Sequence, residues 1–441
     1  MYNIKDFGAE GTGDKINTRA IQAAVDACSE AGGGTVICPA GIYLTGTIWL
    51  RENVNLHLEA GCELRACTDK SEYNSVDCFP ERDIVAHQNA NGTHLILAYR
   101  VNNISITGEG RINGNCEAFF VEGKYEHKSF AGHYMYNIPE ERPGQMIHIC
   151  RCTNVTIKDV SIDNACFWSV YMLGCDYIKI SGVSIKVLEV PNGDGLHFSC
   201  CRNIIISDCD IDSQDDCLIF RGHYHPLGEN IPCENVVVTN CLLKTFCCGF
   251  RIGVGDGVVR NCHFSNIVMH HTRQGINFMP AYSVRYPRGT DIDNINFSNI
   301  TMDVMIPLYM SNTGDADLRN INFSGLRVNM THAAIIIGDV NKYFDMTFTD
   351  SIFNVVPGPK QVLGGMYAEI PNCNFHIENT SGVKFRDCLI RYRETVDKVD
   401  SVFNIVNCED MTLEDVDFCN SVEFAAEKIV NNDSRINIDK I

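Results

Sequence analysis

A short phrase recurs along most of this 441-residue chain: an Asn or Asp, then alternating apolar residues, then a polar turn. Clear copies are NISITG from Asn103, NVTIKD from Asn154, NIIISD from Asn203, NINFSN from Asn294 and DMTFTD from Asp345. Later copies begin at residues 294, 320 and 345, with spacings of 26 (320 − 294) and 25 (345 − 320) residues. Apolar residues at every second position indicate strands, and a repeat of this length built from strands predicts a β-solenoid.

The recurring Asn favours a solenoid whose coils stack in register. Asn tolerates left-handed backbone dihedral angles at a turn, and its amide can bond to the Asn of the next coil. Leucine-rich repeats share the period, but their Leu-x-x-Leu-x-Leu phrase does not recur in this sequence. We therefore predict an all-β chain that folds as a right-handed parallel β-helix, a single domain over residues 1–441.

Residues 1–50 break the repeat pattern. We expect a short strand at residues 3–7, a glycine-rich turn, and then a helix that begins near Asn17 or Thr18 and ends at the glycines 32–34. Its apolar face comprises Ala20, Ile21, Ala24, Val25 and Cys28. Because the open end of a solenoid exposes strand edges, we expect residues 1–50 to form an N-terminal cap and the first coil.

The charge balance excludes one class of partner. With 36 Lys and Arg against 55 Asp and Glu the net charge is −19, whereas binding to a nucleic-acid backbone requires clustered basic residues. We therefore expect no nucleic-acid partner. No apolar run is long enough to cross a membrane, and residues 1–6 lack the apolar core of a signal peptide. We expect a cytoplasmic protein without a membrane partner, and the sequence allows a homo-oligomer.

The number and spacing of the cysteines agree with the expected cytoplasmic location. The 23 Cys are an odd number and include the adjacent pairs Cys200-Cys201 and Cys247-Cys248. Small disulfide scaffolds have a different pattern, and no closely spaced Cys or His doublets recur at the spacing of a zinc finger. We expect mostly reduced, buried thiols and no metal.

Two turn phrases, NGDGLH from Asn192 and SQDDC from Ser213, place three carboxylates about one coil apart. Asp194 and Asp215 are separated by 21 residues (215 − 194), so we expect them, with Asp216, on neighbouring strands about 4.8 Å apart. Like charges at this distance disfavour joint ionisation, so at least one proton should be retained near neutral pH. Spacing alone leaves three interpretations open: ordinary turn residues, a calcium site, or general acid and base groups acting on a glycosidic bond.

Three motifs are more specific than the repeat: NACFW from Asn164, NGD from Asn192 and DDC from Asp215. They are similar to the Asn-Ser-Pro-Phe-Trp, Asn-Thr-Asp and Asp-Asp motifs of glycoside hydrolase family 28, the polygalacturonase family. With the N-terminal segment NIKDFGAEGTGD, the resemblance extends to about residue 300.

The resemblance implies a fold and a reaction. The family fold is a right-handed parallel β-helix, and its reaction is an inverting displacement. Carried over to this chain, the resemblance makes Asp215 the general acid, while Asp194 and Asp216 activate water.

The chain departs from the family at two positions. CGF from Cys248 stands where the family has Gly-His-Gly, and Asn277 and Met279 stand where it has Arg-Ile-Lys, which binds the galacturonate carboxylate. Asn and Met cannot make a charge-assisted, bidentate contact with a carboxylate. We therefore expect homogalacturonan to be a poor substrate.

Further polar and aromatic residues are candidates for substrate binding, although each also suits a structural role at the rim of a coil. They are Asn192, His197, Arg221, His223, Arg251, Arg273, Asn277 and Trp168. The insertion at residues 116–144, rich in Phe, Tyr and His, is expected to form a rim of the same groove.

We predict an inverting glycoside hydrolase that acts, without cofactor or metal, on a small oligosaccharide or glycoside. A calcium-assisted uronate lyase or epimerase is one alternative, but the matching strands offer no convincing Lys or Arg for such chemistry. A non-catalytic glycan-binding β-helix is the other, and the three carboxylates would then be surplus.

Overall fold

The computed structural model describes residues 1–75, 90–126, 133–281, 288–312, 314–358, 372–392, 399–420 and 427–439. The chain forms two compact units. The N-terminal unit comprises Met1–Tyr125, Tyr134–Ile219 and Tyr224–Ile231, and the C-terminal unit comprises Glu126–His133, Phe220–His223 and Pro232–Ile441. The expectation of one domain over residues 1–441 stays a prediction.

Strands dominate the N-terminal unit. It begins with β1 (Tyr2–Asn3), the 3-10 turn η1 (Ile4–Phe7), β2 (Thr12–Ile16), α1 (Thr18–Glu30), β3 (Gly34–Cys38), β4 (Gly41–Thr45), β5 (Ile48–Trp49), β6 (Val54–Leu58), β7 (Cys62–Ala66) and η2 (Lys70–Glu72). It continues with β8 (Ile96–Tyr99), β9 (Asn102–Gly108), β10 (Arg111–Asn113), η4 (Cys116–Ala118), β11 (Val121–Glu126), β12 (His133–Asn137), β13 (Ile147–Cys150), β14 (Thr153–Lys158), β15 (Ser161–Asp163) and β16 (Val170–Leu173). Its last elements are β17 (Asp176–Ser181), β18 (Ser184–Lys186), β19 (Leu196–Ser199), β20 (Arg202–Ser207), β21 (Asp210–Ser213), the start of β22 (Leu218–Gly222) and η5 (His225–Leu227).

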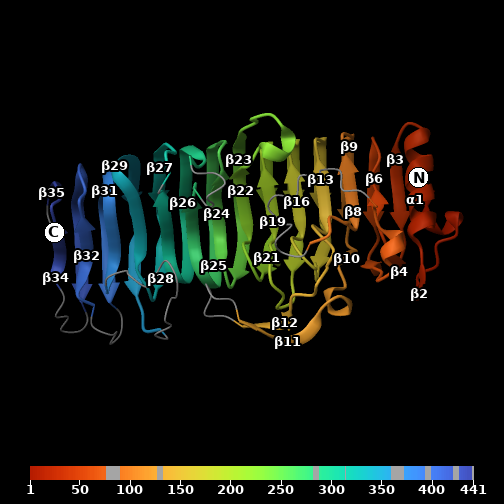
Figure 1. Ribbon diagram of the computed structural model, residues 1–441, viewed down its shortest axis with the longest axis horizontal. Coiled ribbons are helices and arrows are strands. Elements are labelled where there is room, and N and C mark those ends of the chain that lie inside the picture. The colour runs from red at the N-terminus through yellow and green to blue at the C-terminus, as the bar shows by residue number, and fades with distance from the viewer. Residues whose placement is uncertain are drawn as a thin grey trace. The chain divides into compact units, whose positions relative to one another are not determined.

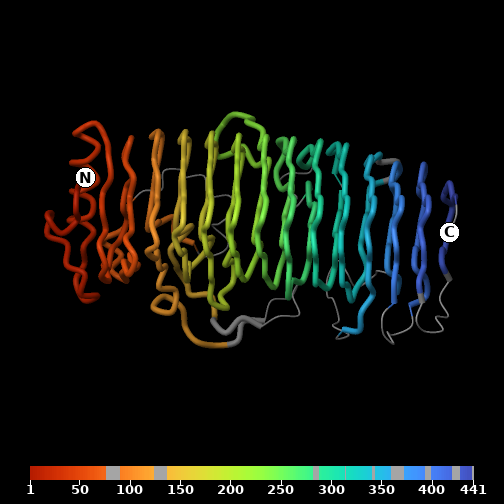
Figure 2. Tube along the Cα trace, turned by 180° about the vertical axis from the view of Figure 1, so that it is seen from behind, coloured from red at the N-terminus to blue at the C-terminus, as the bar shows by residue number. Residues whose placement is uncertain are grey.

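The C-terminal unit contains both long and short strands, which Figure 2 shows as successive coils from green to blue. They are β23 (Cys233–Thr245), β24 (Cys248–Gly255), β25 (Val258–Met279), β26 (Asp291–Asn312), β27 (Leu318–Ser324), β28 (Arg327–Met330), β29 (Ala334–Thr349), β30 (Ile352–Val355), β31 (Cys373–Tyr392), β32 (Ser401–Val406), β33 (Met411–Asn420), β34 (Glu427–Asn432) and β35 (Ile436–Asp439). Among the described residues, no helix has the length and apolar character needed to span a bilayer.

The coils arise from sets of short strands that repeat along the chain. β13, β16 and β19 lie side by side in parallel, with Ile147 opposite Val170 and Val170 opposite Leu196 (Figure 1). These coils are therefore 23 (170 − 147) and 26 (196 − 170) residues long. β14, β17 and β20 form a second parallel set, and β15, β18 and β21 form a third. The predicted right-handed parallel β-helix is confirmed.

The N-terminal segment contains the predicted helix, but the start of the helix and residues 4–7 differ from the prediction. α1 packs on β3, β5 and β6, and its buried residues include Ile21, Ala24, Val25 and Cys28. Asn17 precedes the helix but does not cap it, because its Oδ1 accepts a hydrogen bond from Glu10 N at 2.7 Å instead. Residues 4–7 are a 3-10 turn rather than the expected strand, because Asn3 caps the turn by accepting from Lys5 N.

The interior of each unit is made of similar apolar side chains stacked from coil to coil. In the N-terminal unit one such ladder comprises Ile106, Ile157, Ile180 and Ile206. In the C-terminal unit the rings of Phe323 and Phe348 stack with centroids 4.6 Å apart, and those of Phe348 and Phe385 with centroids 4.5 Å apart. Each buried aliphatic or aromatic side chain contributes about 1.5–3 kcal/mol to folding, so these ladders hold the coils in register.

The recurring Asn residues form the predicted ladders at the turns. Asn103 Nδ2 donates to Asn53 Oδ1 at 2.8 Å, and Asn154 Nδ2 donates to Asn103 Oδ1 at 3.0 Å. All three have φ between 55° and 61°. In the C-terminal unit Asn294 Nδ2 donates to Asn261 Oδ1 at 3.0 Å. The predicted interpretation of this residue as turn chemistry is confirmed.

Candidate functional site

Asp194 lies in a tight turn directly before β19. Asn192 in this turn has a φ of 62°, which Asn adopts at lower cost than most residues. A Cβ atom added to Gly195 would lie 2.5 Å from the carbonyl oxygen of Cys217, so only glycine allows the turn to approach the next coil this closely. The Asp194 side chain is buried, with 3% of its surface exposed.

The segment that contains Asp216 is hydrogen-bonded to this turn. Gly195 N donates to the carbonyl oxygen of Asp216 at 2.8 Å, and Gln214 N donates to that of Gly193 at 3.0 Å. The neighbour of Asp194 on the next coil is therefore Asp216, 22 residues later (216 − 194), and the expected pairing with Asp215 is wrong by one residue. The carboxylates also lie in the connecting segments before β19 and β22 rather than on strands, because these strands begin only at residues 196 and 218.

Asp215 completes the cluster of three carboxylates. Its N–H donates to the carbonyl oxygen of Gly193 at 3.3 Å, and its own carbonyl oxygen accepts from Ser213 Oγ at 2.8 Å. Asp215 is half-buried whereas Asp216 is buried. Two adjacent coils thus bring the three residues together, and their catalytic roles stay predictions.

His197, on β19, joins Asp194 to an aromatic cluster. Its Nδ1 lies 3.5 Å from Asp194 Oδ2, and its ring centroid lies 4.1 Å from that of Trp168. Trp168 also stacks on Phe167 at 4.9 Å and meets the edge of Tyr171 at 5.3 Å. Because Trp168 is only 3% exposed, it belongs to the packing around His197 in this structure. Its role as a substrate-binding residue stays a prediction.

Arg142 is a component of this site that the sequence did not reveal. It is fully buried, and its Nη2 donates to Asn192 Oδ1 at 2.6 Å. Asn192, which we predicted to bind substrate, therefore accepts a hydrogen bond from another side chain of the protein. Nothing in the sequence could have shown it, because Arg142 precedes its partner by 50 residues and lies in the 116–144 insertion, outside the repeat.

That insertion is only partly described. β11 and β12 form a separate two-stranded sheet (Figure 1), and residues 127–132 lie outside the described part of the chain. The expected role of the insertion as a rim of the groove stays a prediction.

Arg251 and Asn277 are neighbours in register on β24 and β25 of the C-terminal unit. Arg251 Nη1 donates to Asn277 Oδ1 at 3.4 Å and lies 3.6 Å from Met279 Sδ. Asn277 Nδ2 donates to Gln274 Oε1 at 2.7 Å. The Arg251 guanidinium group therefore lies beside Asn277 and Met279, the two residues from which we predicted poor binding of a galacturonate carboxylate.

The remaining candidates of this unit are buried. Arg221 lies on β22, His223 follows that strand directly, and Arg273 lies on β25. Their exposed fractions are 7%, 1% and 7%. Their roles in substrate binding stay predictions.

Neither unit by itself offers an evident metal site in the part of the chain that the structure describes. No three His, Cys, Asp or Glu side chains within one unit bring their ligand atoms together there. The described cysteines are all buried except Cys419. Burial of the thiols is confirmed, while the absence of a metal or cofactor stays a prediction.

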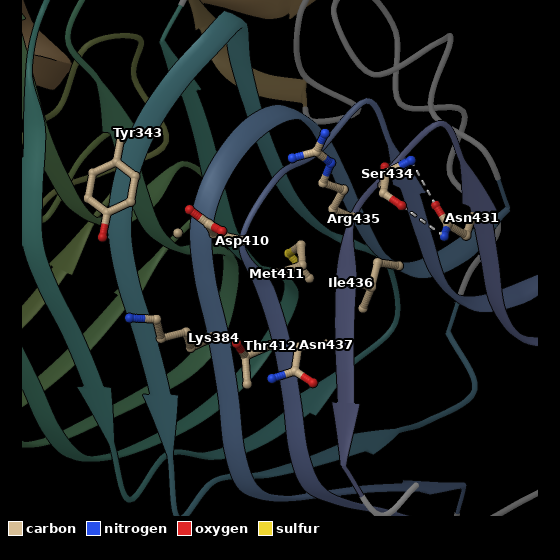
Figure 3. Close-up of a pocket in the computed structure, with 11 residues that line it drawn as sticks. Tyr343, Lys384, Asp410, Met411, Thr412, Asn431, Ser434, Arg435, Ile436 and Asn437 are labelled. Atoms are coloured by element: carbon tan, nitrogen blue, oxygen red, sulfur yellow. Dashed lines mark hydrogen bonds between the residues drawn. The ribbon is translucent and has the colours of Figure 1, made fainter.

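A pocket of about 710 Å³ lies in the C-terminal unit (Figure 3). Lys384, Thr412 and Asn437 occupy one row across β31, β33 and β35, and Tyr343, Asp410 and Arg435 lie around them. None of the predicted site residues lines this pocket.

A family model and several known proteins match this chain. Residues 66–225, which contain all three motifs, match the model for Glycosyl hydrolases family 28. A probable polygalacturonase of Vitis vinifera is 26% identical over 69% of this chain and 61% of its own length. An exo-poly-alpha-D-galacturonosidase of Dickeya chrysanthemi is 25% identical over 50% of this chain and 42% of its own length. The chain thus spans roughly half of these relatives.

Two solved structures share the fold of this chain. A family 28 exopolygalacturonase of Yersinia enterocolitica superposes with a TM-score of 0.62 at 17% identity, covering 99% of this chain and 77% of that one. A hyperthermoactive exopolygalacturonase of Thermotoga maritima gives a TM-score of 0.57 at 19% identity, covering 91% of both chains. These likenesses support the fold, and the match over residues 66–225 contains the carboxylate motifs. Over residues 66–225 the chain is therefore similar to glycosyl hydrolases family 28, with about 25% identity to the relatives named above.

Proposed function

We propose that this chain is an inverting glycoside hydrolase in which Asp215 is the general acid and Asp194 and Asp216 activate water. The observation that carries the proposal is the direct hydrogen bonding between the Asp194 and Asp216 segments, with both side chains buried. Burying carboxylates close together costs free energy. Such arrangements concentrate where a protein uses the charges for chemistry.

The geometry suits a division of roles among the three carboxyl groups. Asp215 is the most exposed of them, which suits a group that must reach the glycosidic oxygen and give it a proton. Asp194 and Asp216, on adjacent coils, would take a proton from a water molecule as its oxygen bonds to the anomeric carbon from the opposite face. The bond to the leaving group breaks in the same step, so the product has the inverted anomeric configuration. His197, against Asp194, would keep that carboxylate in place.

The proposed substrate is a small oligosaccharide or glycoside of the cytoplasm rather than homogalacturonan. The support is the presence of Asn277 and Met279 in place of the cations that hold a galacturonate carboxylate in the family. A uronide is the second candidate, and the contact between Arg251 and Asn277 favours it. A guanidinium group can bind a carboxylate with two parallel hydrogen bonds, and the relatives named above are enzymes of polygalacturonate.

The test is a panel of neutral glycosides and short oligogalacturonides, with release of reducing sugar as the measurement. NMR of the first product should show the inverted anomer, and no unsaturated product absorbing in the near ultraviolet should form. Appearance of that chromophore, or loss of turnover in chelator that calcium restores, would replace hydrolysis by a lyase reaction. Tight binding without turnover of any substrate would favour a glycan-binding protein.

A further inference from the structure

Arg142 is a buried cation to which the proposed mechanism gives no role. None of its surface is exposed. Its backbone is fixed, because its carbonyl oxygen accepts a hydrogen bond from Asn91 N at 2.9 Å. A buried guanidinium group is retained in a protein when its donors find acceptors, since burying an unpaired charge is costly.

The guanidinium group of Arg142 joins two neighbouring coils. Its Nη1 donates to the carbonyl oxygens of Cys166 at 3.1 Å and Pro191 at 2.7 Å, and its Nη2 donates to Asn192 Oδ1 at 2.6 Å. Cys166 belongs to the NACFW motif, and Asn192 begins the NGD motif that contains Asp194. One side chain thus connects two sequence motifs that are separate in the chain.

Two aromatic rings flank the same group. The guanidinium carbon lies 4.8 Å from the ring centroid of Phe167 and 5.7 Å from that of Phe120. Arg binds to aromatic faces through its planar, delocalised cation. The rings restrict the plane of the guanidinium group while its hydrogen bonds restrict its position. A Lys ammonium has neither the planar shape nor the fork of donors that this arrangement uses.

The turn that presents Asp194 is therefore held from two sides. Arg142 holds Pro191 and Asn192, and the next coil holds Gly193 through the hydrogen bond from Gln214 N at 3.0 Å. We propose that Arg142 is a positioning residue, which sets the Asp194 carboxylate relative to Asp216 without touching the substrate. The inference rests on the proposed function, because it assigns Asp194 to the activation of water.

The test compares Arg142→Met and Arg142→Lys with the wild type on the substrate that the panel identifies. A displacement of a reacting group by about 1 Å can cost up to about a hundredfold in rate, so kcat should fall about ten- to hundredfold in both variants. KM should stay within about threefold of the wild-type value. Asn192→Ala combined with Arg142→Met should be no slower than the slower single variant, since both act through the same turn.

Arg327→Met is the matched control. The Arg327 guanidinium group donates to the carbonyl oxygens of Leu326 at 2.9 Å and Asp350 at 2.7 Å, in the C-terminal unit. This variant therefore removes two hydrogen bonds to carbonyl oxygens within the C-terminal unit, whereas Arg142→Met removes three at the Asp194 turn. This variant should keep the wild-type kcat. An equal loss of kcat in this variant, or a kcat within twofold of wild type in Arg142→Met, would overturn the proposal.

Hydrogen–deuterium exchange separates this inference from the proposed function, because it needs no substrate. The amides of residues 192–195 should exchange about tenfold faster in both Arg142 variants, and no faster in Arg327→Met. If the wild type hydrolyses nothing in the panel but this local change is seen, the proposed function fails and the positioning contact stands. Unchanged exchange at residues 192–195 would overturn the positioning role. Should Arg142→Met fail to fold, Arg142→Lys carries the same two measurements.

Discussion

The Nδ1 atom of His197 lies 3.5 Å from Oδ2 of Asp194, and both side chains are buried. The imidazole also packs against Trp168 with ring centroids 4.1 Å apart. The ring therefore has neighbours of different chemistry, the aromatic side chains of Trp168 and Tyr171 and the carboxylate of Asp194. This relationship links the NACFW coil to the carboxylate of the next coil, and it provides the first prediction.

Replacing His197 with Gln should lower activity more than stability. Gln fills much of the same volume but leaves Asp194 without the imidazole beside it, so we expect kcat to fall about tenfold, which corresponds to about 1.4 kcal/mol. Steady-state kinetics and thermal unfolding of the same preparation measure the two effects. A variant with wild-type kcat and a lower unfolding temperature would show that His197 acts only in packing.

Asp215→Asn should separate the acid from the two residues that act on water. Without a proton for the leaving group, turnover of a substrate with a poor leaving group should fall by about two to four decades. On an activated aryl glycoside the loss should be much smaller. Asp194→Asn and Asp216→Asn should slow both substrates similarly, since water must be activated in either case. Near-normal turnover of the poor substrate by Asp215→Asn would make the acid assignment wrong.

Arg251→Gln tests the second candidate substrate. If the guanidinium group beside Asn277 binds a uronate, its removal should lower kcat/KM on an oligogalacturonide by about one to two decades, as for a lost charge-assisted hydrogen bond of roughly 1.5–3 kcal/mol. A neutral glycoside should be affected less than twofold. Arg251→Lys is the control, because it keeps the charge and loses the bidentate geometry. Equal losses on acidic and neutral substrates would exclude a contact with the carboxylate.

The thiols should differ sharply in reactivity. Burial raises the pKa of Cys116 and of Cys373 to about 12, and that of Cys388 to about 11. Since the thiolate is the reactive form, these thiols should resist iodoacetamide at pH 7.5, whereas exposed Cys419 should react within minutes. Peptide mass spectrometry can follow each site, with the denatured chain as the control. Rapid labelling of Cys116 in the native protein would contradict the burial described here.

His376 should make stability depend on pH below neutrality. Burial lowers the pKa of its imidazole, although Glu378 at 3.0 Å favours the charged form. Its Nδ1 accepts from Asn404 Nδ2 at 2.9 Å, which requires an unprotonated nitrogen.

The sign of this pH dependence follows from the lower pKa of His376 in the folded state. As pH falls through about 6.5, the ordinary value for His, the unfolded chain takes up the proton first. The contribution of His376 to stability is therefore present above about pH 6.5 and is lost below it. Urea unfolding at pH 7.5 and 5.5 should show a smaller decrease for His376→Gln than for wild type. Equal decreases in the two proteins would rule out this contribution.

Local sequence patterns predicted the fold because each strand and turn of the solenoid is determined by residues that are close together in the sequence. Alternating residues such as Ile104 and Ile106 fix the buried face of a strand, and Asn154 marks a turn that repeats in every coil. Counting residues between motifs also located the carboxylate cluster. It named Asp215 as the neighbour of Asp194 where Asp216 is correct, because the register is set by the starts of β19 and β22 and these cannot be read to one residue from spacing.

Contacts made by insertions could not be predicted. Arg142 lies outside the repeat, so no periodicity assigns it to a coil, and its partners are known only from the path of the insertion. The burial of Trp168 could not be predicted either, because it also depends on a segment outside the repeat. Its cluster includes Leu227, which belongs to another connecting segment. Repeats determine which residues of the coils are neighbours, whereas the folding of the long connections determines what covers them.

The hydrogen bonds between the Asp194 and Asp216 segments have a consequence for biosynthesis. No single coil contains the carboxylate cluster, and Arg142 ties in the coil of Cys166 as well. A nascent polypeptide therefore acquires the complete arrangement only after residue 217 has emerged from the ribosome and its segment has paired with residues 193–196. A chain stopped between residues 194 and 214 can stack its earlier coils but holds only Asp194 of the three. Because domains begin to fold while they are being made, the hydrogen-bonding state of residues 193–196 in a series of stalled chains would record the chain length at which the last of these coils closes.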